Sequence, residues 1–240
     1  MLHQIDKENY KDNYLNNLRD LMNPISERSG MIINTPYNHL AEKKKLLMVG
    51  FNPGGVPSDL MTSIKEDFSR HSENPSFNAL DERWGNHASG QHPIQLLYQA
   101  LIKYTELVSS DILQTNIYWQ RSSDINKLKI DSMLENNCRE GLMLNIKTHK
   151  PKSIIFLGHK AAETAQKWAD ISFSNGDIKY PWGTNHTIKF YSMKFDDHRI
   201  KAFSIPHPSR FGFGSDMYRL AAILKAANRC DIELEVKIDE

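Results

Sequence analysis

The apolar residues of the chain fall into short segments that predict buried strands. Leu46–Val49 and Ser153–Leu157 are almost continuously apolar, which is typical of strands covered on both faces. Asp111–Tyr118 is predicted to be another buried strand. Thr187–Met193 and Ile200–Ile205 alternate apolar and polar positions on either side of a turn, as strands with one solvated face do.

Segments with helical spacing of apolar residues separate these strands. The helix that begins at Pro93 is the clearest, because proline is tolerated in the first turn and apolar residues then recur every three or four positions. The other predicted helices are about 8–22, a short one near Leu60–Phe68, Met133–Lys147, Lys160–Trp168 and Met217–Asn228. Strands that alternate with helices predict an α/β fold, in which a mostly parallel sheet carries helices on both faces.

Composition and length agree with a globular protein of one sizeable α/β domain or two small ones. The chain has 240 residues, of which 40% are hydrophobic and 25% charged, so it can bury a sizeable core. No apolar run approaches the roughly 18–20 residues of a membrane span, and the polar start lacks the apolar stretch of a signal peptide. We therefore expect a cytoplasmic protein that does not enter membranes. Cys138 and Cys230 are too few and too far apart for a disulfide framework or a metal cluster and are expected to be packed thiols.

The charge balance argues against an extended DNA-binding surface. The formal net charge is +1, whereas nucleic-acid-binding domains are often strongly basic. A local basic groove remains compatible with this sum, because the last ten residues hold five acidic side chains against one lysine, so the rest of the chain is more basic. Lys43–Lys45 is expected to be a solvated edge that could also touch phosphate.

Gly50-Phe51-Asn52-Pro53-Gly54 closes the first predicted strand with a sharp turn. Glycine allows a close approach to the main chain, and the amide of Asn52 offers both a donor and an acceptor for a water molecule or a polar base. Taken alone, the segment is also an ordinary turn, since Asn, Pro and Gly are all common in turns.

His207-Pro208-Ser209-Arg210-Phe211 follows the strand that ends at Ile205. A histidine can donate to a developing anion, a hydroxyl group can hold a phosphate, and an apolar side chain can act as a wedge in DNA. By itself, His207 is equally well a loop histidine without a role, since the chain has nine others.

Asn116 ends a third predicted strand, where its amide could form paired hydrogen bonds with a base or simply cap a turn. Ligands of parallel α/β sheets bind at the carboxyl ends of the strands. Because all three segments are at such ends, we expect Asn52, Asn116 and His207 to form one site.

The order and spacing of these segments resemble the uracil-DNA glycosylase superfamily over about residues 46–211. Gly50–Gly54 is similar to the water-activating motif of its mismatch-specific and single-strand-selective branches, which carry Asn there. Cys138-Arg139, Lys150-Pro151 and Leu157-Gly158 are more similar to the bacterial iron–sulfur branch. The resemblance implies one domain over residues 1–240, a three-layer α/β/α sandwich around a four-stranded, mostly parallel sheet. The N-terminal helix and the acidic C-terminal tail lie outside it.

The resemblance also implies a role for each matching residue. Asn52 would position the hydrolytic water, Asn116 would read the flipped pyrimidine, and His207 would stabilise negative charge on the departing base. The remaining implied contacts are with the base, by Gly50, Phe51, Pro53, Gly54 and either Phe68 or Phe77 as the stacking aromatic, and with DNA, by Ser209 at a phosphate and Arg210 or Phe211 in the vacated stack. DNA would be the partner of a monomer that needs no cofactor, metal or other protein.

Departures from the family limit what the resemblance implies. Two cysteines cannot hold the iron–sulfur cluster, and the neutral amide of Asn52 cannot accept a proton as a general base. The expected activity is that of a monofunctional DNA glycosylase that removes uracil-like pyrimidines or modified cytosines. Trp119-Gln120-Arg121 after Asn116 is bulkier than expected there and, with the long 69–91 loop, favours hypermodified phage cytosine as substrate, in host defence.

Other interpretations remain open. The alternative function is a non-catalytic module that binds DNA or a nucleotide on the same fold. The low net charge favours it, as does Asn52, which stands where the most active branch of the superfamily carries Asp. His87 and His92 lack the further ligands that a metal site needs. Ser122-Ser123-Asp124 is expected to cap a helix, because no strained nucleophile turn surrounds it.

Overall fold

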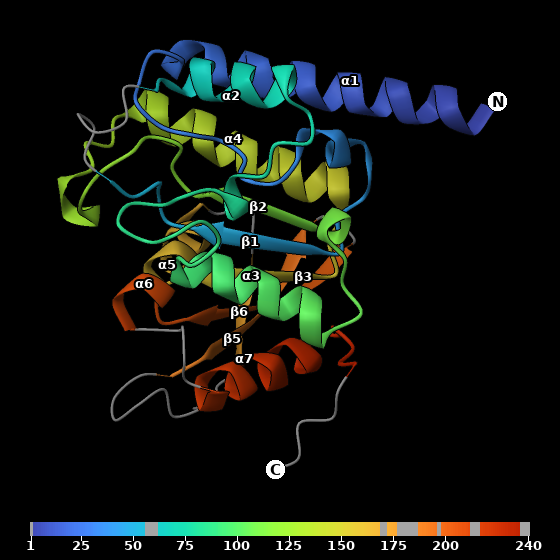
Figure 1. The fold of residues 1–240 in the computed structure, drawn as a ribbon, viewed down its shortest axis with the longest axis vertical. Helices are drawn as coiled ribbons and strands as arrows, with labels where there is room; N and C mark the ends of the chain where they lie inside the picture. Colours follow the sequence, from blue (N-terminus) through green and yellow to red (C-terminus); the bar gives the residue numbers. More distant parts are fainter. Residues whose placement is uncertain are drawn as a thin grey trace.

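The computed structural model describes residues 2–55, 62–168, 172–176, 187–195, 198–211 and 217–235; of 2–11, 41, 172–176, 211 and 217–218 it describes the backbone alone. Figure 1 shows the arrangement of the elements. The helices are α1 (Leu2–Met22), α2 (Ile64–Glu73), α3 (Pro93–Tyr104), α4 (Ser132–His149), α5 (His159–Lys167), α6 (Pro208–Phe211) and α7 (Met217–Arg229). The strands are β1 (Leu46–Gly50), β2 (Ile112–Asn116), β3 (Ser153–Leu157), β4 (Ser172–Gly176), β5 (Lys189–Phe195) and β6 (His198–Ile205). Short 3-10 turns are η1 (Asn23–Ile25), η2 (Tyr37–Ala41), η3 (Ala79–Asp81), η4 (Ser109–Asp111) and η5 (Ile125–Lys127).

The strands form one mixed sheet in the order β2-β1-β3-β6-β5-β4. β2, β1, β3 and β6 are parallel, as expected, whereas β5 and β4 are antiparallel to their neighbours. The α/β class and the mostly parallel sheet are therefore confirmed, but the expectation of four strands is wrong. β5 and β6 are the two alternating segments of the sequence, which pair as neighbours. β4 was not predicted because Ser172–Gly176 holds a single large apolar residue and so lacks a strand pattern.

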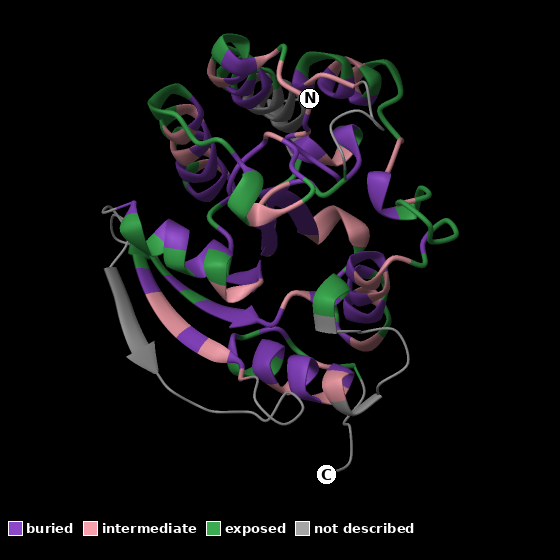
Figure 2. Ribbon diagram, turned by 90° about the vertical axis from the view of Figure 1, so that its left-hand side faces the viewer, coloured by how far each residue is buried: buried purple, intermediate pink, exposed green. Residues whose placement is uncertain are grey.

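Helices cover both faces of this sheet, as the sequence predicts. Successive side chains of a strand point to opposite faces, and Leu47 accordingly belongs to the core cluster of α1, α4 and α5, whereas Met48 belongs to that of α3 and α7. Figure 2 shows the buried strands between helices whose outer surfaces are exposed. We call the side covered by α3 and α7 the α3 face.

Local sequence explains where the helices begin and end. His92 caps α3 by accepting the amide N–H of Ile94, and Pro93 occupies the first turn, as predicted. Asp131 caps α4 in the same way. α4 ends at Lys150, whose left-handed φ of 47° leads into Pro151.

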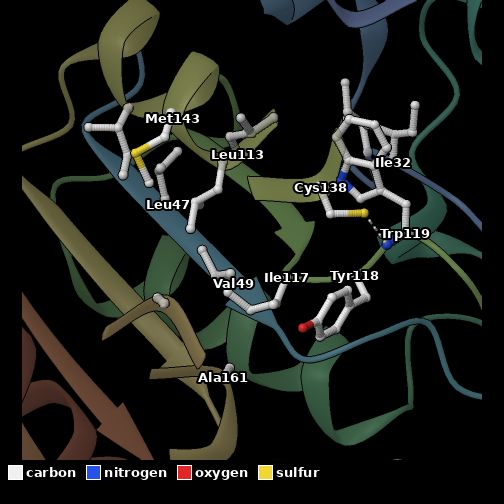
Figure 3. Close-up of a cluster of buried hydrophobic side chains, with 14 of the residues drawn as sticks. Ile32, Leu47, Val49, Leu113, Ile117, Tyr118, Trp119, Cys138, Met143 and Ala161 are labelled. Carbon is white, nitrogen blue, oxygen red and sulfur yellow. Dashed lines mark hydrogen bonds between the residues drawn. The ribbon is translucent and has the colours of Figure 1, made fainter. Parts of the chain in front are cut away.

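Packing around Trp119 leaves no room for a side chain at position 141. Figure 3 shows the buried Trp119 beside Cys138, whose sulfur accepts the backbone N–H of Trp119. A Cβ atom on Gly141 would lie well under 3.0 Å from the Trp119 ring. We therefore expect Gly141→Ala to lower the free energy of unfolding by about 1–3 kcal/mol, as overpacked cores do. Denaturant titration measures this, and Gly54→Ala is the control, because no heavy atom lies within 4 Å of a Cβ there. Equal losses in the two variants would contradict the packing argument.

Candidate active site

Four parallel strands end in one row. Gly50 of β1 is in register with Asn116 of β2 and with Leu157 of β3, and Leu157 is in register with Ile205 of β6. Leu157 and Ile205 belong to the core cluster on the α3 face, so Asn116, in the same row, has the same orientation. The sheet thus brings together the strand ends at which the segments of Asn52, Asn116 and His207 begin, as the sequence predicts.

Gly50 and Asn116 are interdependent. A Cβ atom on Gly50 would collide with Oδ1 of Asn116, at well under 3.0 Å. The Asn116 side chain therefore lies over the backbone of Gly50, and it is only 5% exposed. The need for glycine at position 50 comes from this amide rather than from the turn conformation that the sequence suggested.

Asn52 is held by hydrogen bonds within its own loop and with the segment after β2. Its Nδ2 donates to the carbonyl oxygens of Pro53 (2.9 Å) and Ser122 (3.4 Å). The amide of Ser122 donates to the carbonyl of Pro53, and that of Tyr118 to the carbonyl of Phe51. Because both Nδ2 contacts are to acceptors, only the amide nitrogen can occupy that position. Within the described part of the chain, Oδ1 of Asn52 has no hydrogen-bond partner, so it is an acceptor that a water molecule can use.

Arg121 is a site residue that the sequence argument noticed only as bulky. It is 8% exposed, and its Nη1 donates to the carbonyl of Gly54. Burial lowers the pKa of its guanidinium, and the nearby carboxylate of Asp67 opposes that shift. Burial in turn raises the pKa of Asp67 to about 6, against the lowering effect of Arg70 and Arg121. The sequence could have pointed to Arg121 only as a cation that lies near three strand ends. The pattern of a single sequence does not show which cation does so.

His207 follows β6 and lies against Gly158, which follows β3. Gly158 has a φ of 102°, and a Cβ there would lie 3.5 Å from Cβ of His207. Burial, with a smaller contribution from Arg210, lowers the pKa of His207 to about 4, so the ring is neutral at pH 7. The Ser209 hydroxyl lies 2.7 Å from Nδ1 of His207. If that hydroxyl donates, the ring carries its proton on Nε2, where it is a neutral N–H donor.

The other predicted contacts have mixed positions. Phe51 is buried and packs edge-on against Tyr118, with ring centroids 5.3 Å apart, so its side chain belongs to the core. Pro53 is buried and Gly54 is exposed at the loop. Ser209 and Arg210 are exposed on α6. Phe211 ends α6, and its side chain lies outside the described residues.

The structure does not bring the two proposed stacking aromatics to the strand ends. Phe68 is buried between α2 and α1, where its ring meets Tyr37 edge-on at 5.8 Å and Arg19 lies above it. Phe77 packs between His71 and Arg70 beyond the far end of α2. On the α3 face, the ring centroid of Trp84 lies 5.1 Å from that of His92.

The remaining candidates have structural roles. Asp124 caps η5, which confirms the interpretation of Ser122–Asp124 as a helix cap. Cys138 and Cys230 are buried free thiols, and burial raises the pKa of each to about 12. Across the described ranges, no group of three or more His, Cys, Asp or Glu side chains is placed to hold a metal ion.

No family of known proteins matches this chain, and no curated protein is significantly similar to it. Among the described helices, none is both long and apolar enough to cross a membrane. What the chain can do must therefore be argued from the geometry of the site itself.

Proposed function

We propose that this protein is a monofunctional DNA glycosylase that flips out an altered pyrimidine and hydrolyses its N-glycosidic bond. The observation that carries the proposal is the shared row of strand ends. Asn116 ends one of these strands with a side-chain amide, and Asn52 and His207 follow two others with an amide oxygen and a neutral ring. An acceptor for water, an amide for the base edge and a donor for the leaving group are the three functions that this hydrolysis needs.

The proposed mechanism follows from base flipping. The target base leaves the stack at a cost of about a few kcal/mol. Asn116, fixed against Gly50, hydrogen-bonds the edge of the base. The bond from the sugar to the base then lengthens, and the electron pair leaves with the base, where the Nε2–H group of His207 stabilises it. Water bound to Oδ1 of Asn52 attacks the sugar carbon and leaves an abasic site.

The catalysis in this mechanism is by orientation and charge stabilisation. Asn52 has no proton-accepting capacity at neutral pH, so its role is to hold the water in line with the sugar. Ser209, Arg210 and Phe211 on α6 are proposed to contact the DNA backbone and the vacated stack, beside His207. The protein is proposed to act on DNA as a monomer and without a cofactor.

The substrate range is also a proposal. Uracil and modified cytosines share the pyrimidine edge that a single amide can recognise. Gly54 and Gly55 are exposed at the loop, and no heavy atom lies within 4 Å of a Cβ on Gly54. This open side favours a base with a bulky substituent, such as the hypermodified cytosine of phage DNA.

The second candidate function is a non-catalytic DNA-binding or nucleotide-binding module. The neutral amide at position 52 favours it, because an amide cannot take the proton of the attacking water. A module of this kind would keep the base pocket at Asn116 and bind without turnover.

A panel of single-stranded and duplex DNA substrates tests the function. Each substrate carries one uracil, one 5-hydroxymethylcytosine or one glucosylated cytosine, and alkali-induced strand cleavage reports abasic sites. We expect at least one to be processed, and Asn52→Ala to slow that reaction about 100-fold by releasing the water. Asn137→Ala is the matched control, since this half-buried asparagine donates to the carbonyl of Met133 in its own helix and lies outside the candidate site. Tight binding without abasic sites on any substrate would favour the module.

A further inference from the structure

His92 and His207 are far apart in the sequence, but they adjoin two helices that pack against each other. His92 caps the N-terminus of α3, which covers the α3 face of the sheet. α3 packs against α6, the helix that begins at Pro208, directly after His207. The His92 ring is therefore carried to the row of strand ends by a helix rather than by a loop.

The cap determines which ring nitrogen of His92 carries the proton. Nδ1 accepts the backbone N–H of Ile94 at 3.3 Å, so this nitrogen must present its lone pair. In a neutral imidazole the other nitrogen then holds the proton. Burial lowers the pKa of His92 to about 4, with further lowering by His87 and His207, which keeps the ring neutral at pH 7.

Two aromatic neighbours restrict the rotation of the His92 ring. Trp84 and His87 each have a ring centroid 5.1 Å from that of His92, the first tilted and the second edge-on. The His92 ring accepts a hydrogen bond at one nitrogen and packs against two other rings, so its remaining N–H group points in one direction. Such a preorganised donor is the kind that stabilises charge in a transition state.

We propose that Nε2–H of His92 is a second donor, beside His207, to the O2 atom of the departing pyrimidine. This inference rests on the proposed function. As the bond from C1′ to N1 breaks, both electrons leave with the base and spread onto O2, where the two N–H groups donate. The water oxygen bonds to C1′, and the proton that it releases ends on the base anion. With a neutral Asn52, paired donors supply stabilisation on the leaving-group side that a carboxylate would otherwise supply at the water.

His92→Asn separates the donor from the cap. Asparagine is a good N-cap and can still accept from Ile94, but its short side chain cannot present the Nε2–H group. Single-turnover rates are measured on duplexes that carry uracil or 5-fluorouracil, the latter being a better leaving group. We expect about 10–100-fold slower release of uracil, the order for one lost oxyanion donor, and a distinctly smaller loss for 5-fluorouracil, with an unchanged melting temperature.

The comparison variant is Asn52→Ala, which acts on the water and is expected to slow both substrates by similar factors. Equal losses on both bases in His92→Asn, or a loss that follows a lower melting temperature, would overturn the second-donor role.

Ring nitrogen NMR tests the inference even if the wild-type protein cleaves none of the substrates, which would refute the proposed function. We expect both rings to be Nε2–H tautomers at pH 7 and both Nε2 signals to shift when free 5-fluorouracil is added. An Nδ1–H tautomer at His92, or a shift confined to His207, would overturn the inference.

Discussion

Replacing His207 with alanine is expected to slow base release about 1,000-fold, the upper end for loss of one preorganised oxyanion donor. The His207 side chain lies against Gly158, where an added Cβ would lie 3.5 Å from the Cβ of His207. The ring is neutral because burial lowers its pKa to about 4. A neutral N–H donor gains most when charge develops on the base and little before, so the loss should appear in the single-turnover rate rather than in DNA affinity.

Two further variants test whether the ring acts as a donor. His207→Gln keeps an N–H group and is expected to recover part of the rate. Ser209→Ala removes the hydroxyl 2.7 Å from Nδ1 and with it the preference for the Nε2–H tautomer, so an intermediate loss is expected. If alanine and glutamine at position 207 were equally slow while Ser209→Ala had no effect, the ring would be acting through its bulk alone.

The hydrophobic pattern predicted the part of the fold that forms the site. Each of the four parallel strands was visible as an apolar or alternating segment, and each ended at a conspicuous residue or one to two residues before it. Side chains alternate between the two faces of a strand, and paired residues of parallel strands point to the same face. The number of residues between a strand end and a side chain therefore also determines on which face of the sheet that side chain lies. Asn116 is itself the last residue of its strand, and Asn52 and His207 each lie two residues after the end of theirs. This is why the three residues could be grouped from the sequence.

The stacking aromatic could not be predicted in the same way. Phe68 and Phe77 are predicted only as aromatics of the segment after the Asn52 loop, since the usual spacing of the family falls on neither. α2 directs the first into the core beneath α1 and carries the second away from the strand ends. The direction of a helix relative to the sheet depends on packing across the whole domain. His92 caps α3, which packs against the helix that follows His207, and no local spacing shows this.

β4 and the hydrogen bond from Arg121 to the Gly54 carbonyl were not predicted, for related reasons. A strand as polar as Ser172–Gly176 depends on its neighbour β5 for pairing rather than on its own pattern. Arg121 is polar, yet it is buried because its guanidinium replaces water at the carbonyl of Gly54. Buried polar groups of this kind are compensated by partners that are distant in sequence.

Acid is expected to destabilise the protein through His149, at the opposite end of the sheet from the site. The ring is 1% exposed and packs edge-on against Tyr14 at 4.9 Å. Burial, and then the nearby ammonium of Lys44, lower its pKa to about 3, against a smaller opposing effect of the Glu42 backbone. In the unfolded chain the ring titrates near its ordinary value of about 6.5.

The sign of this effect follows from the two pKa values. Above pH 6.5 the ring is neutral in both states, and its contribution to stability is complete. As the pH falls from 6.5 towards 3, the unfolded chain takes up a proton that the folded chain refuses, so stability is lost. At about 1.4 kcal/mol for each pH unit, the loss between pH 7 and pH 5 is about 2 kcal/mol, and it continues to grow down to about pH 3.

Denaturant unfolding at a series of pH values measures this, provided that variants are compared. Asp67 contributes with the opposite sign, because its pKa is raised to about 6 in the folded protein, and His71, His92 and His207 contribute with the same sign, because their pKa values are lowered to about 4. The wild-type curve therefore contains all of these effects. Subtracting the curve of His149→Leu removes these shared effects and isolates one proton. Tyr14→Phe is the matched control, since it removes the hydroxyl that donates to Asn145 but no titrating imidazole. If Tyr14→Phe flattened the pH dependence as much as His149→Leu, the acid sensitivity would come from weakened packing around α1 rather than from proton uptake by His149.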